Sequence, residues 1–187
     1  RQRQMCIRDS VHMAHHRDEF GPDEPDKALY AGYPIGHASL RRKIVRDATG
    51  RTGTKLFRQF LGNLRHPNPQ SRRATRQILA VQAVLIAAAI ISGHWWVYPV
   101  LWLAPYLTAW RVINRLRSIA EHGGMHRSKD RRESTHSVRQ HLLARFYLVP
   151  FHIGWHLAHH VDAGVPFRNL PRFHRALHEA GYVDATL

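Results

Sequence analysis

The feature that most constrains the fold is an uncharged apolar block in the middle of the chain. Residues 78–110 read "ILAVQAVLIAAAIISGHWWVYPVLWLAPYLTAW" and contain no Asp, Glu, Lys or Arg. The block is too long and too apolar for one amphipathic helix, whereas a membrane-spanning helix needs about 20 apolar residues. Gly93 divides it, and the aromatic residues that follow are typical of a membrane interface. We therefore predict a helical hairpin in a membrane, with spans at about 72–92 and 96–116.

The charge distribution supports a membrane protein with both flanks of the hairpin on one side. The formal net charge is +15 and the isoelectric point is about 11.2, which fits either a nucleic acid or an anionic membrane as partner. Arginines stand at both ends of the apolar block: Arg72, Arg73 and Arg76 precede it, and Arg111, Arg115 and Arg117 follow it. The positive-inside rule then places both flanks in the cytoplasm. No zinc-finger, RNA-binding or helix-turn-helix pattern is present, so we expect no nucleic acid partner.

A basic stretch precedes the apolar block. Residues 38–64 combine apolar and basic positions at helical spacing, and Gly50 and Gly53 interrupt the pattern. We predict two amphipathic helices that lie in the headgroup interface of a membrane. A solvated charged face on a soluble helix is the alternative. The only cysteine is Cys6, so any metal must be held by nitrogen and oxygen ligands.

Two copies of the pattern HxxHH are the strongest chemical signal in the chain. The first consists of His12, His15 and His16, and the second of His156, His159 and His160. Positions i, i+3 and i+4 share one face of a helix, so each copy directs three imidazoles the same way. Two membrane crossings lie between the copies and return the chain to its starting side. We therefore expect the six histidines to converge on the cytoplasmic face.

Glu121 and His122 follow the second predicted span and could join this cluster. We expect His122 to be a seventh ligand and Glu121 to orient a neighbouring histidine. Zinc is saturated by about four ligands, so seven histidines indicate two ions. Imidazole suits iron, copper and zinc, and a site next to lipid favours iron and oxygen chemistry on a hydrophobic substrate. His152 stands one helical turn before His156 and is a further residue that could reach the site.

The order "HxxHH … EH … HxxHH" around a membrane hairpin resembles the integral-membrane fatty acid desaturase and hydroxylase superfamily. The tail "WHLAHHVDAGVPFRNLPRFH" resembles the desaturase ending, and "HHRDEFGPDEPDKALYAGYP" and "RRKIVRDATGRTGTK" are similar to stretches of bacterial desaturase-like proteins. The resemblance covers residues 11–182. It implies an all-α protein of the bacterial inner membrane whose histidine boxes face the cytoplasm.

The resemblance also implies the ligand set and the reaction. His12, His15 and His16 correspond to the second histidine box of the family, His156, His159 and His160 to the third, and His122 to the additional ligand. His174 falls in the tail motif and would support the site by hydrogen bonding. Such enzymes hold two iron ions and use O2 with two electrons from a ferredoxin, rubredoxin or cytochrome. They introduce a double bond into the acyl chain of a membrane lipid.

Three other functions stay open at this point. A hydroxylase or ketolase could use the same scaffold, because "EHGGM" also resembles a motif of alkane hydroxylases. A metal transporter with cytoplasmic histidines would need polar residues in its spans, but residues 78–91 offer only Gln82. The third is a non-catalytic membrane protein that retains the fold.

The beginning of the chain departs from the family pattern. Residues 1–10 include "QMCIRDS", which resembles the translation of an adapter used in DNA library preparation, and we predict that they are a sequencing scar. The family's first histidine box, HxxxH or HxxxxH, has no counterpart in the sequence. We therefore expect residues 11–187 to be a partial desaturase domain, truncated at its N-terminus. Such a fragment would not assemble a complete diiron site and would be inactive alone.

Overall fold

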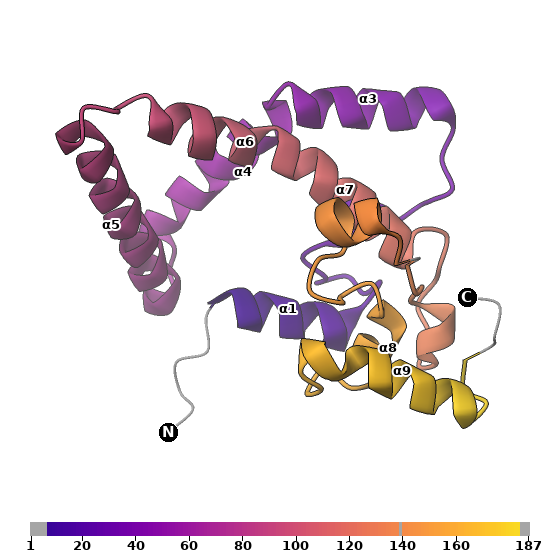
Figure 1. Cartoon of the computed structure of the whole chain (residues 1–187). Helices are drawn as coiled ribbons and strands as arrows, with labels where there is room; N and C mark the ends of the chain where they lie inside the picture. Colours follow the sequence, from indigo (N-terminus) through magenta and orange to yellow (C-terminus); the bar gives the residue numbers. More distant parts are fainter. Residues whose placement is uncertain (1–6, 139, 184–187) are drawn as a thin grey trace. The chain divides into compact units, whose positions relative to one another are not determined.

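A computed structural model describes residues 7–138 and 140–183 of the chain (Figure 1). All secondary structure in these ranges is helical, which confirms the all-α prediction. The chain divides into two compact units. Unit 1 comprises residues 1–35 and 113–187, and unit 2 comprises residues 36–112. The predicted scar lies partly outside the described ranges and stays a prediction. Its residues 7–10 belong to the first turns of helix α1 (Ile7–Asp18).

Unit 2 begins with the two basic helices expected from the sequence. They are α3 (His37–Ala48) and α4 (Arg51–Gly62), and Gly50 between them adopts a φ of 77°, which favours glycine. A short 3-10 turn, η1 (Asn63–Arg65), leads to α5 (Pro69–Ile91). Helix α4 packs against α6 (Ala104–Leu107), and α5 packs against η1. Unit 2 therefore joins the basic helices directly to the apolar segment.

Helix α5 coincides with the first predicted membrane span. Asn68 caps it by accepting a hydrogen bond of 2.8 Å from the backbone N–H of Gln70, and Pro69 occupies the first turn. Among the described residues it is the one helix long and apolar enough to cross a membrane, judged by length and composition. Many of its apolar side chains are exposed: Val84 is 67% exposed and Ile91 is 86% exposed. An apolar helix of 23 residues with so little protein around it is suited to lipid.

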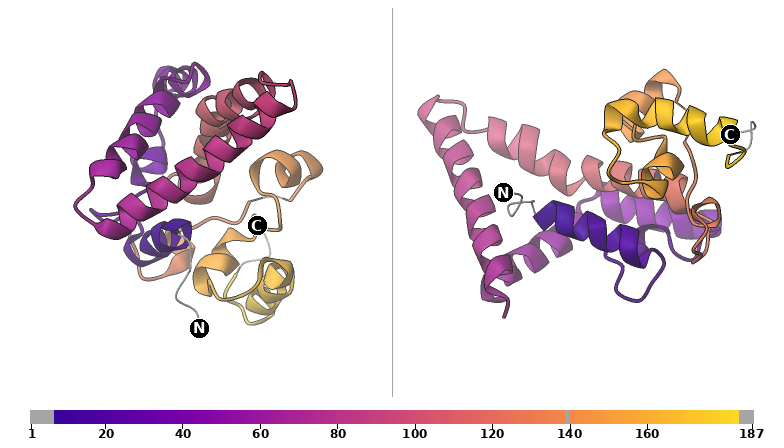
Figure 2. Two further views of the ribbon diagram at one scale, coloured as in Figure 1. Left: turned by 90° about the vertical axis from the view of Figure 1, so that its left-hand side faces the viewer. Right: turned by 90° about the horizontal axis from the view of Figure 1, so that it is seen from below.

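The second predicted span is not one continuous helix. It comprises a π-helical segment, η2 (Tyr98–Leu103), then α6, an interruption at Thr108, and finally α7 (Ala109–His122). Pro99 and Pro105 remove backbone donors in this stretch, which explains its irregular hydrogen bonding. Helix α5 and the segment η2–α6 diverge from the turn that joins them (Figures 1 and 2). That the second segment crosses a membrane stays a prediction.

Unit 1 is built around polar residues. Its helices are α1 (Ile7–Asp18), α2 (Lys27–Tyr30), most of α7, α8 (His156–Val161) and α9 (Leu170–Glu179), with the helical turns η3 (Arg131–Glu133), η4 (Ala144–Leu148) and η5 (Phe167–Asn169). Helices α8 and α9 pack side by side (Figure 1). The buried apolar residues of the unit are Tyr30, Ala144, Val149, Leu157, Ala158, Leu170 and Val183. This small apolar core surrounds a larger cluster of buried histidines and carboxylates.

Candidate metal centre

Seven histidines from three helices of unit 1 converge in two adjacent sets. Helix α1 supplies His12, His15 and His16, the end of α7 supplies His122, and α8 supplies His156, His159 and His160. The first set is buried and consists of His15, His122, His156 and His160; the second consists of His12, His16 and His159. Within each set the ligand atoms lie within 4.8 Å of one another. Both sets could therefore hold a metal ion.

The helical spacing of each triad brings two imidazoles together within its own helix. His12 and His16 are one turn apart on α1, and their Nε2 atoms are 3.1 Å apart. His156 and His160 have the same relation on α8, again with 3.1 Å between the Nε2 atoms. His122 then joins the pair on α8, because its Nε2 lies 3.1 Å from that of His156. Each triad thus presents its imidazoles on one face of a helix, but each contributes residues to both sets.

The three Nε2 atoms of the second set lie close together. His159 Nε2 is 2.9 Å from His12 Nε2 and 3.0 Å from His16 Nε2. These three imidazoles would therefore hold an ion between them.

The two sets share a boundary. The rings of His16 and His160, one from each set, stack with centroids 4.1 Å apart and an interplanar angle of 25°. His15 approaches His122 and His160 with centroid distances of 4.9 and 5.1 Å. Two ions held by these sets would be neighbours, as in two-metal sites that act on one substrate.

Glu19 is the main carboxylate behind the buried set. Its Oε1 lies 2.9 Å from Nδ1 of His122, and its Oε2 lies 3.5 Å from Nδ1 of His160. Nδ1 of His122 also donates to the backbone carbonyl of Ser134 at 3.0 Å. Because both partners of this Nδ1 are acceptors, Nδ1 donates to them and Nε2 is the nitrogen that would bind a metal.

Glu19 is held in place by three donors from the segment after α7. Arg131 donates to it at 2.6 Å, Thr135 at 2.8 Å and Ser134 at 3.0 Å. Burial would raise the pKa of Glu19, but the hydrogen bonds from His122 and His160 outweigh it and lower the pKa. Glu19 is therefore an anion behind two of the four buried imidazoles.

Two further carboxylates face the other buried histidines. Glu24 contacts Nδ1 of His15 and accepts a hydrogen bond from the hydroxyl of Tyr30. Glu121 lies 3.6 Å from Nδ1 of His156 and accepts from Arg117 at 2.7 Å. Each of the four buried histidines thus faces a carboxylate. By contrast, the side-chain hydrogen bonds and ring contacts of His16 and His159 within the described residues are with other imidazoles.

Burial keeps most of these imidazoles neutral. Burial and the neighbouring histidines lower the pKa of His16 to about 2 and that of His160 to about 3. The pKa of His159 falls to about 4 for the same reasons, and that of His156 also falls well below its ordinary value. Neutral imidazole is the form that binds a metal, so the cluster is prepared for ligation at neutral pH.

Three residues, Glu121, His152 and His174, were expected to support the ligands, and the structure places one of them against a ligand. Glu121 faces His156, as the sequence analysis anticipated. His152 lies in the turn before α8, and within the described residues its side chain makes no hydrogen bond or ring contact with the seven histidines. The ring of His174 lies against that of Trp155 at the start of α8, with centroids 4.3 Å apart and an interplanar angle of 35°. In the part of the chain that the structure describes, His174 makes no hydrogen bond or ring contact with the seven histidines.

The sequence analysis missed Glu19 and Glu24. Glu19 follows His15 and His16 by four and three positions, so the helical period that defined the triad also pointed to Glu19. Glu24 lies in an acidic stretch rich in proline and glycine, which has no helical periodicity. Its place behind His15 depends on the turn after α1, which no periodic pattern predicts.

Comparisons with known proteins agree with this chemistry. The family model described as "Fatty acid desaturase" matches residues 7–185 of the chain. A comparison with curated proteins found no match, and a comparison with solved structures found none either.

Proposed function

The chain belongs to the fatty acid desaturase family, and we propose that its histidine cluster holds two iron ions for an O2-dependent desaturase of membrane acyl chains. The observation that carries the proposal is the pair of adjacent histidine sets, one of them backed by carboxylates at all four members. Iron accepts such imidazole ligands, and seven of them exceed the four that saturate one zinc ion. When bound, the iron pair supplies the activation of O2 and the oxidising power that removes hydrogen from the chain.

The protein's own residues bind, orient and shield the pair. Glu19 and Ser134 fix the ring of His122 through its Nδ1, so that Nε2 faces the site. Tyr30 is 1% exposed, and its ring lies 4.8 Å from that of His122. It therefore closes the buried side against water. Arg131 neutralises the buried anion of Glu19, and Arg117 pairs with Glu121, whose pKa burial raises.

Exposed apolar surface supports a substrate in a membrane. Helix α5 presents apolar side chains along its length. In unit 1, the segment before α8 is similar: Leu142 is 84% exposed, Phe146 75% and Phe151 72%. Patches of this kind mark contact with protein or lipid. We infer that lipid covers both segments, that the histidine sets face the cytoplasm of a bacterial inner membrane, and that a ferredoxin, rubredoxin or cytochrome delivers the electrons.

Product analysis tests the reaction. The complete gene that contains this sequence would be expressed in a bacterial host with an electron donor, and the membrane fatty acids would be analysed by mass spectrometry. We expect new products two mass units lighter than their saturated precursors. Products 16 units heavier would instead identify a hydroxylase of the same superfamily, and unchanged lipids would contradict both functions.

A matched pair of variants connects the product to the cluster. His156→Ala removes a buried member of the four-histidine set, and we expect loss of both iron and product. His178→Ala changes an exposed histidine of the same unit and should leave both unchanged. Full activity of the His156→Ala variant would refute the proposed site.

A further inference from the structure

We propose that the α3–α4 helix pair binds the phosphate-bearing headgroups of anionic phospholipids, an inference that rests on the membrane placement proposed above. The observation behind it is the charge balance of unit 2. Residues 36–112 include twelve Lys and Arg side chains and a single carboxylate, that of Asp47. Asp47 is 0% exposed, and its Oδ1 accepts a hydrogen bond from Thr52 at 2.5 Å. The surface of unit 2 is therefore positive and carries no acidic group.

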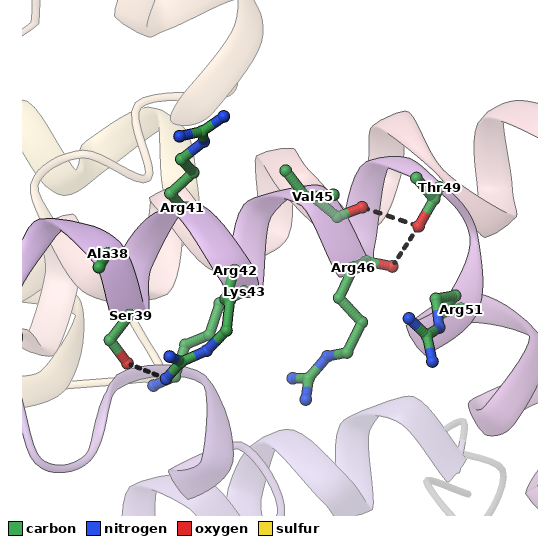
Figure 3. Close-up of a pocket in the computed structure, with 9 residues that line it drawn as sticks. All are labelled: Ala38, Ser39, Arg41, Arg42, Lys43, Val45, Arg46, Thr49 and Arg51. Carbon is green, nitrogen blue, oxygen red and sulfur yellow. Dashed lines mark hydrogen bonds between the residues drawn. The ribbon is translucent and has the colours of Figure 1, made fainter.

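The cations of α3 and the start of α4 gather around one hollow. It is lined by Ala38, Ser39, Arg41, Arg42, Lys43, Val45, Arg46, Thr49 and Arg51. Figure 3 shows that Arg42, Lys43, Arg46 and Arg51 extend to the same side of the helix and Arg41 to the other. Three or more guanidinium and ammonium groups on one side match the charge and the several acceptor oxygens of a phosphate.

The hydrogen bonds of these arginines leave their charge uncompensated. Arg42 donates to Ser39 Oγ at 3.3 Å, and Arg46 donates to Thr52 Oγ1 at 3.2 Å. Both acceptors are neutral hydroxyls. Arg51, Lys55 and Arg58 make no hydrogen bond or ion pair within the described part of the chain. The positive potential is thus available to an external anion.

The apolar residues of the same unit favour lipid over nucleic acid as the source of that anion. On α4, Leu56, Phe57, Phe60 and Leu61 accompany the basic positions, an arrangement that is typical of helices in a headgroup interface. η1 packs against both α4 and α5, so the basic pair directly adjoins the candidate span. Arg72, Arg73 and Arg76 add charge at the start of α5. A nucleic acid would use the cations but leave the apolar surface uncovered.

Headgroup proximity can be measured on the full chain. A variant with Cys6→Ser and Ala38→Cys would carry a fluorophore on α3, next to the hollow. It would be reconstituted into phosphatidylcholine nanodiscs that contain a headgroup spin label, with or without 30% phosphatidylglycerol (a chosen composition, on the order of a bacterial membrane). We expect stronger quenching with phosphatidylglycerol, and loss of this increase at high salt.

Two triple variants with equal charge change give the test its specificity. Arg42→Gln, Arg46→Gln and Arg51→Gln together should abolish the phosphatidylglycerol effect, since each cation near an anionic surface strengthens binding by about fivefold. Arg168→Gln, Arg172→Gln and Arg175→Gln remove the same charge from exposed positions in unit 1 and should preserve the effect. Equal loss in both triples would show a response to net charge alone and overturn the proposal.

Other outcomes would overturn it in distinguishable ways. Quenching that does not depend on phosphatidylglycerol would show that α3 lies away from the headgroups. Release by inorganic phosphate at low millimolar concentration would indicate a soluble ligand, and tighter binding of a DNA duplex than of anionic nanodiscs would indicate a nucleic acid surface. Failure of the chain to enter nanodiscs would refute the membrane placement as well. Iron content, measured on the same samples, reports on the proposed function separately.

Discussion

At the scale of single residues, Glu19 connects two helices that supply ligands to the four-histidine set. It contacts His122 from α7 and His160 from α8, and the donors Arg131, Ser134 and Thr135 hold it in place. A carboxylate behind a ligating imidazole fixes the orientation of the ring and raises its basicity. Glu19 therefore positions two ligands without belonging to the ligand set.

Replacing the Glu19 carboxylate with an amide should weaken metal binding. We expect Glu19→Gln to lower the affinity of the four-histidine set by about 10- to 100-fold, because the amide is neutral and offers one acceptor fewer. Titration with Co2+, followed by visible absorption, measures this directly. Glu133→Gln is the matched control, since that side chain is 53% exposed and, within residues 7–138 and 140–183, its ion pair is with His126. Equal affinity in both variants would contradict the positioning role.

The lowered pKa values predict how acid affects the metal-free protein. His159, His160 and His16 have folded pKa values of about 4, 3 and 2, against 6.5 as the ordinary value. Below pH 6.5 the unfolded chain binds protons that the folded chain excludes. Stability is thus fully present above pH 6.5 and is lost as the pH falls towards 4, by about 1.4 kcal/mol per pH unit for each group.

His122 acts in the opposite direction but does not reverse this trend. Burial lowers its pKa, yet the hydrogen bond to Glu19 outweighs burial and raises it. Its stabilising effect is present below pH 6.5 and is lost as the pH rises through its folded pKa. The buried Glu121, whose pKa burial also raises, acts in the same direction as His122. Five histidines with lowered pKa values act against these two groups: His16, His156, His159, His160 and His174. The Tm of the metal-free chain should therefore fall from pH 7 to pH 5. A Tm that is constant or rises over this range would contradict the burial of neutral imidazoles.

At the scale of helices, the close approach of α4 and α6 depends on Gly53. A Cβ at this position would lie 2.1 Å from the backbone oxygen of Leu107, and a backbone atom cannot move aside as a flexible side chain can. Gly62, in the same helix, has no atom within 4 Å of such a Cβ. The two glycines therefore differ in packing while they share a helical conformation.

Alanine at these two glycines should change stability in opposite directions. We expect Gly53→Ala to destabilise unit 2 by about 1–3 kcal/mol, the usual cost of overpacking. Gly62→Ala should stabilise it by about 0.5–1 kcal/mol, because alanine reduces the freedom of the unfolded chain. Thermal unfolding in detergent, followed by circular dichroism, would measure both. A Gly53→Ala variant as stable as the parent would show that α4 and α6 are not in close contact.

The sequence predicted a helix correctly where the apolar run was uninterrupted, and less well where prolines interrupted it. Helix α5 lies close to its predicted bounds, because Pro69 and Gly93 mark its ends and the run from residue 78 to residue 91 is uncharged. The stretch from 96 to 116 was predicted as one helix, but Pro99 and Pro105 divide its hydrogen bonding into π-helical and α-helical segments. Composition alone does not show how a chain compensates for missing backbone donors.

At the scale of the whole molecule, the sequence predicted which histidines would meet but not how they would be grouped. Helical spacing indicated that each triad shares a face, and topology indicated that the triads lie on one side of the membrane. The observed sets, however, mix residues of α1, α7 and α8. Their division depends on tertiary contacts such as those of Glu19, which link segments more than a hundred residues apart. No local pattern encodes such contacts.

The two units should also differ in their dependence on metal. The buried interior of unit 1 contains imidazoles whose Nε2 atoms point at one another, and its apolar core is small. A bound cation satisfies these nitrogens, so much of the folding free energy of unit 1 should come from the metal. Unit 2 contains none of the seven histidines.

Hydrogen exchange with and without a chelator tests this difference. We expect removal of metal to accelerate exchange in α1 and α8 by about 100-fold, the effect of a ligand present at 100 times its Kd. Exchange in α3 should stay the same, which makes it an internal control in every sample. The His156→Ala variant should show fast exchange in α1 and α8 even with metal present. If α1 and α8 kept their protection after chelation, the histidine cluster would be a structural core that needs no ion, and the proposed metal centre would be wrong.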